Sequence, residues 1–172
     1  MNRFVRRAVV TIALVALPTL AATPAFAAAQ AGPRPQQKPS AEVMAQYEAE
    51  VVKLTNDQRV SHGCKALRVD DRLTTAARAH SADMVSQNFF SHTGSNGSTF
   101  AARETAAGYP QRGASAENIA WGYRTAKDVM TGWMNSPGHR ANILNCGSVA
   151  VGVGVTYNAA GAPYWTQDFG RI

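Results

Sequence analysis

Three side chains of the sequence have the chemistry of a polar site: His92, Glu117 and His139. An imidazole can accept a proton or bind a metal ion, and a carboxylate can orient an imidazole or act as a base. His92 follows two aromatic residues on a predicted loop, and Glu117 lies in a short predicted strand. A carboxylate on a sheet that is covered on both faces needs a partner or a cavity.

His139 lies in the first turn of a helix that we expect to begin at Ser136 and Pro137. The positive end of the helix dipole disfavours a protonated imidazole there, so the ring stays neutral and able to bind a metal or accept a proton. The sequence contains no H-x-x-x-H, G-x-S-x-G or Cys–His nucleophile signature. From the residues alone, the convergence of the three side chains is therefore a hypothesis.

The other two histidines have simpler interpretations. His62 ends a predicted helix, where we expect it to face water and to interact with the negative end of the helix dipole. His80 falls on the apolar face of the next predicted helix, so we expect a core residue with its polar atoms satisfied.

Caps and hydrophobic periodicity predict the elements that position these residues. Ser40 caps a helix that ends at Gly63, and Asp70 or Asp71 caps a second helix. Shorter helices are expected over 98–107 and after Thr125 and Ser136, and strands over 116–121, 149–155 and 164–169. Residues 158–161 form a turn, which makes the last two strands a hairpin. We therefore predict the α+β class, with helices on both faces of a small, mainly antiparallel sheet.

The N-terminal residues predict export. Residues 1–27 have a basic start, a short apolar run and the small-x-small site Ala25-Phe26-Ala27, which is typical of a secretory signal peptide. The run is too short for a membrane span, so we expect no stable membrane anchor after cleavage. Residues 28–39 are proline-rich and predict a linker, and residues 40–172 are expected to form one domain.

The charge of the chain gives no indication of a nucleic-acid partner. The net charge is +6, but three of the basic residues precede the predicted cleavage site. The mature chain is therefore near +3, with its basic side chains scattered rather than clustered.

Only two cysteines are present, Cys64 and Cys146. In an oxidising compartment a disulfide between them is the first expectation. A pair of reduced buried thiols and a two-cysteine zinc site are the alternatives.

Motifs spread over about 120 residues resemble the CAP superfamily, named for cysteine-rich secretory proteins, antigen 5 and pathogenesis-related proteins, and in particular its secreted bacterial branch. They are Asn56-x-x-Arg59, Leu73 with its alanine-rich helix, Phe90-Ser91-His92, Glu117-Asn118-Ile119-Ala120, Trp133-x-x-Ser136-Pro137-Gly138-His139-Arg140-x-Asn142-Ile143-Leu144, Gly152-x-Gly154 and Tyr164-Trp165-Thr166-Gln167-x-Phe169-Gly170. The resemblance implies a three-layer α–β–α sandwich with a cleft in which His and Glu side chains meet.

The sequence departs from the pattern of eukaryotic CAP proteins, which typically place two His and two Glu in that cleft. His92 and Glu117 match the first of each. Asn135 and Ser136 stand in the region of the second Glu, and Tyr164 stands at the second His. We expect His139 to supply the missing imidazole, with Tyr164 and Gln167 on the wall of the cleft.

The resemblance implies lipid, sterol or cell-envelope binding, with no reaction common to the family. We therefore expect a secreted, monomeric binding module whose ligand cleft contains His92, Glu117, His139, Tyr164 and Gln167. The alternative is a metal-assisted, protease-like hydrolase, in which His92, His139 and Glu117 would hold a divalent metal such as zinc. Catalytic zinc typically has three protein ligands and an open position, so such a set would leave no general base among the three residues. If Glu117 acts as the general base instead, only two ligands remain.

Overall fold

The computed structural model describes residues 38–172. The predicted signal peptide and residues 28–37 of the predicted linker lie outside this range. The longest helix, α1 (Ala41–Ser61), begins at Ser40, whose hydroxyl accepts a hydrogen bond from the Val43 amide at 3.3 Å. Asp70 caps α2 (Asp71–Ser86) by accepting from the Arg72 amide. Both predicted helix starts are confirmed.

Four strands form one sheet in the order β1-β3-β4-β2. They are β1 (Arg68–Val69), β2 (Ala114–Trp121), β3 (Ala150–Tyr157) and β4 (Pro163–Gly170). The pairs β3–β4 and β2–β4 are antiparallel, and only the two-residue β1 runs parallel to β3. The predicted hairpin, β3–β4, is therefore present. Glu117 lies near the middle of strand β2.

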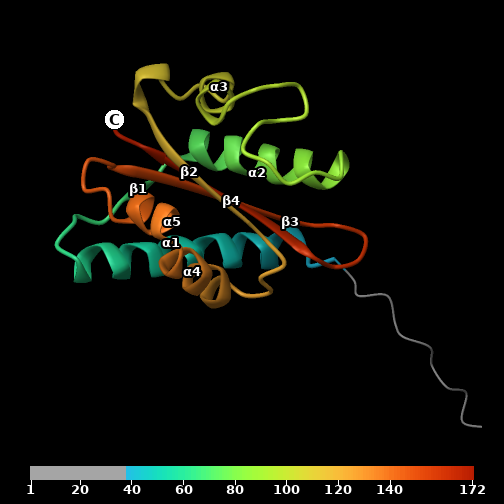
Figure 1. Cartoon of the computed structure of the whole chain (residues 1–172), viewed down its shortest axis with the longest axis horizontal. Helices are drawn as coiled ribbons and strands as arrows, with labels where there is room; N and C mark the ends of the chain where they lie inside the picture. Colours follow the sequence, from blue (N-terminus) through green and yellow to red (C-terminus); the bar gives the residue numbers. More distant parts are fainter. Residues whose placement is uncertain (1–37) are drawn as a thin grey trace, which may run out of the picture. The chain divides into compact units, whose positions relative to one another are not determined.

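Helices cover both faces of the sheet (Figure 1). One layer contains α2 and α3 (Phe100–Ala106), and the other contains α1, α4 (Ala126–Asn135) and α5 (Pro137–Ile143). Gly152 and Gly154 let α2 lie close against β3, because a Cβ at either position would collide with the backbone of α2. The predicted α+β class and α–β–α sandwich are confirmed.

The outer edge of β2 is covered by side chains from the layer of α4 and α5. The buried indole of Trp133 donates to the carbonyl of Ile119 at 3.2 Å, and Asn142 donates to the carbonyl of Glu117 at 3.4 Å. Unpaired backbone groups of an edge strand need such partners. The edge that carries Glu117 is thus held in place without another strand.

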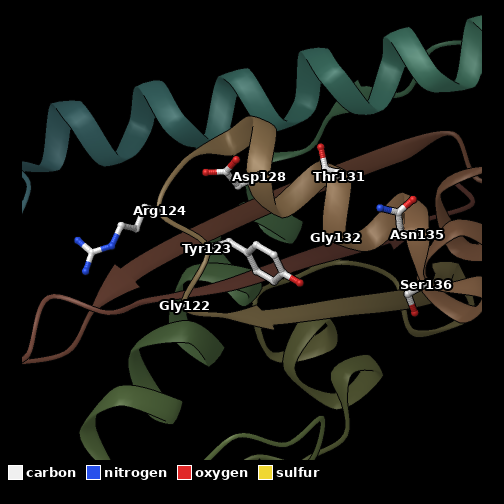
Figure 2. A pocket seen from close by; sticks show the side chains of 8 residues that line it. All are labelled: Gly122, Tyr123, Arg124, Asp128, Thr131, Gly132, Asn135 and Ser136. Carbon is white, nitrogen blue, oxygen red and sulfur yellow. The ribbon is translucent and has the colours of Figure 1, made fainter.

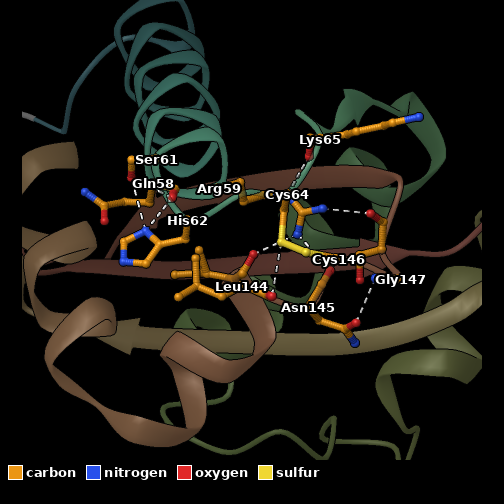
Figure 3. Close-up of a disulfide and its surroundings, with 12 residues drawn as sticks. Gln58, Arg59, Ser61, His62, Cys64, Lys65, Leu144, Asn145, Cys146 and Gly147 are labelled. Atoms are coloured by element: carbon orange, nitrogen blue, oxygen red, sulfur yellow. Dashed lines mark hydrogen bonds between the residues drawn. A yellow bond between two sulfur atoms is a disulfide. The ribbon is translucent and has the colours of Figure 1, made fainter.

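The disulfide between Cys64 and Cys146 is formed, as predicted, and joins the end of α1 to the segment before β3 (Figure 3). Beside it lies the fully buried guanidinium of Arg59, which donates to four backbone carbonyls, those of Lys65, Ile143, Asn145 and Ser148. Burial lowers the pKa of Arg59. This residue of the family motif therefore organises the chain around the disulfide.

Within residues 38–172, no helix is both long enough and apolar enough to cross a membrane.

Candidate functional site

The centre of the site is a contact between His92 and Glu117. His92 lies on the loop after α2, and its Nδ1 is 2.7 Å from Oε1 of Glu117. The His92 side chain is 56% exposed, whereas that of Glu117 is 1% exposed. A carboxylate at this position accepts a hydrogen bond from the Nδ1–H group of the imidazole. The lone pair of the neutral ring is then on Nε2. Glu117 therefore fixes the orientation of the more exposed ring.

Arg103 of α3 holds the other oxygen of Glu117. Its Nη2 is 2.5 Å from Oε2, and its Nη1 donates to the carbonyl of Ser98 at 2.9 Å. A buried carboxylate is stable as an ion only when paired and hydrogen-bonded, and the guanidinium meets both needs. Both oxygens of Glu117 are thus occupied, one by His92 and one by Arg103.

Two more carboxyl groups are buried beside this ion pair. Asp168 is the residue opposite Glu117 in the pairing of β2 with β4, and Glu104 follows Arg103 in α3. Burial and the charge of Glu117 raise the pKa of Glu104 to about 8 and raise the pKa of Asp168 well above its usual value. Glu104 is therefore protonated in the folded protein at neutral pH, and the raised pKa of Asp168 favours its protonated form in the same way. We call Glu104, Glu117 and Asp168 the acid cluster.

His80 supports the loop that carries His92. Its Nε2 is 2.9 Å from the carbonyl of Ser91 and 4.0 Å from Oε2 of Glu117. The ring is fully buried, and burial lowers the pKa of His80. The negative charge of Glu117 acts in the opposite direction and offsets part of this effect. The prediction of a core histidine is confirmed, although its Nδ1 has no hydrogen-bond partner within residues 38–172.

His139 approaches the same edge of the sheet from α5. The residue is half-buried, and its backbone carbonyl accepts from Asn118 Nδ2 at 3.3 Å. Burial and the nearby His92 lower its pKa, which favours the neutral ring that the helix start predicts. His139 lines a cavity of about 280 Å³ together with Phe90 and Trp121. The two histidines therefore lie near each other, while only His92 contacts Glu117 in the described residues.

The two predicted wall residues have different positions. Tyr164 is buried beneath the aromatic rings of Phe90 and Trp121. Gln167 is fully buried and bonds Asn118 and Thr55, so the prediction that it lines the cleft is wrong. Successive residues of a strand point to opposite faces of the sheet. The side chain of β4 that faces Glu117 is therefore that of Asp168, its partner in the pairing of β2 with β4.

The site does not fit the zinc set considered from the sequence. In the part of the chain that the structure describes, no three His, Cys, Asp or Glu side chains gather so as to hold a metal ion. Glu117 has neither oxygen available, because His92 and Arg103 engage both. We therefore derive no metal-dependent step.

A second and larger cavity adjoins the first. Figure 2 shows the side chains that line this larger cavity. Its volume is about 620 Å³, and it lies between the loop after β2 and helix α4. Tyr123 packs over Gly132, where a Cβ would meet the end of the tyrosine ring. Tyr123, Gly132 and Ser136 line both cavities, so the two form one groove that ends at His139.

These features define an α–β–α sandwich in which a buried glutamate orients a half-exposed histidine at one edge of the sheet. The chain belongs to the CAP family, the Cysteine-rich secretory protein family, whose profile matches residues 52–169.

The curated relatives include two Bacillus subtilis (strain 168) proteins, the uncharacterized protein YkwD and the uncharacterized membrane protein YlbC. YkwD is 43% identical over 125 residues, which is 72% of this chain and 46% of YkwD. YlbC is 36% identical over 124 residues, which is 71% of this chain and 34% of YlbC. The chain thus spans less than half the length of these relatives.

Two solved structures share the fold. An extracellular protein containing an SCP domain from Bacillus anthracis str. Ames has a TM-score of 0.69 and 31% identity, over 78% of this chain and 44% of that one. An outer surface protein from Borrelia burgdorferi has a TM-score of 0.67 and 20% identity, over 78% of this chain and 97% of that one. The second likeness concerns the fold alone.

Proposed function

We propose that this protein is exported and that the cleft at His92 and His139 binds a ligand of the cell envelope. Export is supported by the signal pattern of residues 1–27 and by the disulfide, since disulfides persist mainly in oxidising compartments. It is also supported by the Bacillus anthracis relative, which is described as extracellular.

The observation that carries the binding function is the contact between half-exposed His92 and wholly buried Glu117. Burying a carboxylate and its arginine partner is costly, and an exposed histidine without a role needs no such anchor. The anchor keeps the ring in one tautomer and one orientation, as a binding residue on a loop requires. We infer that Nε2 of His92 is presented to a ligand.

A hydrolase is the second candidate, and the same contact favours it. A histidine whose Nδ1 is held by a carboxylate is suited to act as a general base through Nε2. Binding ranks first because no serine, threonine or cysteine side chain is hydrogen-bonded to His92 within residues 38–172. Such a contact marks an activated nucleophile.

Binding is tested by sedimentation of the protein, expressed from its full sequence, with insoluble bacterial cell walls and separately with lipid vesicles. We expect saturable binding to one of these fractions and at least a roughly tenfold loss of affinity in His92→Ala, equivalent to about 1.4 kcal/mol. His62→Ala is the matched control, because His62 is exposed and bonded to Gln58 and Arg140. Absence of binding to both fractions, or equal binding by wild type and His92→Ala, would contradict the proposal.

A further inference from the structure

The exposed aromatic side chains of the described residues are concentrated at the groove beside His139. Phe90, Trp121 and Tyr123 are 51%, 55% and 40% exposed, and no other aromatic residue within 38–172 is among the large exposed apolar side chains. All three line the smaller cavity. Exposed apolar surface gathered in one place is typical of a binding site.

The exposed rings of Phe90 and Trp121 each pack against the buried side chain of Tyr164. The Tyr164 ring centroid lies 6.4 Å from that of Phe90 and 6.1 Å from that of Trp121. At the other end, Tyr123 lies against Gly132. Aromatic rings with fixed neighbours provide flat contact area at little cost in conformational entropy.

The larger cavity adds polar groups to these rings. Its lining includes the neutral hydrogen-bonding side chains of Thr131, Asn135 and Ser136, shown in Figure 2. It also includes one cation and one anion, Arg124 and Asp128, so the lining has no net charge. A ligand that matches this groove is uncharged, has flat apolar faces and has polar groups at its rim.

We propose that the groove binds an uncharged glycan chain whose sugar units carry hydroxyl and acetamido groups. The C–H faces of the sugar rings stack on Trp121 and Tyr123, and the hydroxyl and amide groups bond the polar side chains of α4. A lipid acyl chain fits less well, because it would cover the exposed polar side chains of the lining and leave them without water or another hydrogen-bond partner. This inference rests on the proposed function and names the ligand class of that cleft.

The probe is the tetramer of N-acetylglucosamine, and the readout is tryptophan fluorescence. Trp121 is exposed while Trp133 and Trp165 are buried, so stacking on Trp121 changes the emission of the one exposed indole in the described residues. We expect a saturable change at millimolar sugar or below. Trp121→Phe removes the fluorescent reporter, so the affinity of this variant for the sugar is measured by calorimetry.

Three variants examine the groove itself. Trp121→Ala and Tyr123→Ala should each weaken binding by about tenfold or more. Gly132→Ala should weaken it as well, since the new Cβ displaces the end of the Tyr123 ring. Val60→Ala, which removes an exposed apolar side chain elsewhere, should bind as wild type does. Thermal unfolding of each variant verifies that it is folded.

The outcomes separate this inference from the proposed function. If the walls bind through His92 but the sugar does not bind, or if Trp121→Ala and Tyr123→Ala bind it normally, the glycan inference fails and the proposed function stands. If lipid vesicles bind and Trp121→Ala abolishes that binding, the groove takes a lipid and the inference is overturned. If the sugar binds in the groove while His92→Ala changes no envelope binding, the proposed function fails.

Discussion

The acid cluster predicts that the domain becomes less stable as the pH rises. Glu104 has a pKa of about 8 in the folded protein against 4.5 as its ordinary value, because burial and Glu117 disfavour its charged form. A raised pKa means that the folded state holds a proton that the unfolded state has released. Between these two pKa values, stability therefore falls with pH by about 1.4 kcal/mol per unit.

The perturbation is Glu104→Gln, which keeps the shape of the side chain and removes its ionisation. From pH 5 to pH 8, the free energy of unfolding of wild type should fall by roughly 3–4 kcal/mol because Glu104 titrates. The variant has no ionisable group at this position and should not show this loss. The buried amide adds a penalty of its own, but that penalty is the same at every pH. Asp168 and the histidines titrate in both proteins. Because the charge of Glu104 also raises the pKa of Asp168, the difference between the two slopes measures the ionisation of Glu104 together with its effect on Asp168.

The assay is urea unfolding with the disulfide intact, at several pH values from 5 to 8. Glu50→Gln is the matched control, because Glu50 is exposed on α1, and its slope should equal that of wild type. If Glu104→Gln loses stability as steeply as wild type does, Glu104 is ionised in the folded protein and the account of the acid cluster is wrong.

Three further predictions concern the packing of the domain. Replacing both cysteines by alanine should cost about 4 kcal/mol, since Cys64 and Cys146 close a loop with a sequence separation of 82; equal urea midpoints of the oxidised protein and the double variant would contradict this. Trp133→Ala should cost about 3–5 kcal/mol, and a loss below about 1 kcal/mol would show that the indole is not packed in the core. Arg59→Lys should lower the free energy of unfolding by at least about 3 kcal/mol, because one ammonium group cannot donate hydrogen bonds to all four carbonyls. The control Arg112→Lys, at an exposed position, should leave the free energy of unfolding unchanged in the same assay.

Much of the fold could be predicted from local signals. Ser40, Asp70 and Thr125 are strong capping residues, and each accepts a backbone hydrogen bond at the start of a helix. Ser136 also precedes a helix, but its side chain makes no capping bond, since Pro137 at the first position fixes the backbone there. The two-residue β1 could not be assigned as a strand from local signals, because its pairing with β3 depends on residues far apart in the sequence.

The candidate site could be predicted only in part. His92 and Glu117 were identified from their residue types and the family motif, and they are in contact. Arg103 and Glu104 were missed, because they lie in a short helix whose composition marks no buried face. Asp168 could have been found from strand alternation, since it lies opposite Glu117 once β2 and β4 are paired.

The proposed function requires that His92, oriented by Glu117, contacts the ligand at the edge of β2. The most direct measurement is the imidazole NMR spectrum of the protein, which has four histidines, during titration with solubilised cell-wall glycan. We predict that the His92 and His139 signals shift with saturation while the His62 signal stays in place. Shifts confined to His62, or no shift at a concentration where sedimentation shows binding, would contradict the claim.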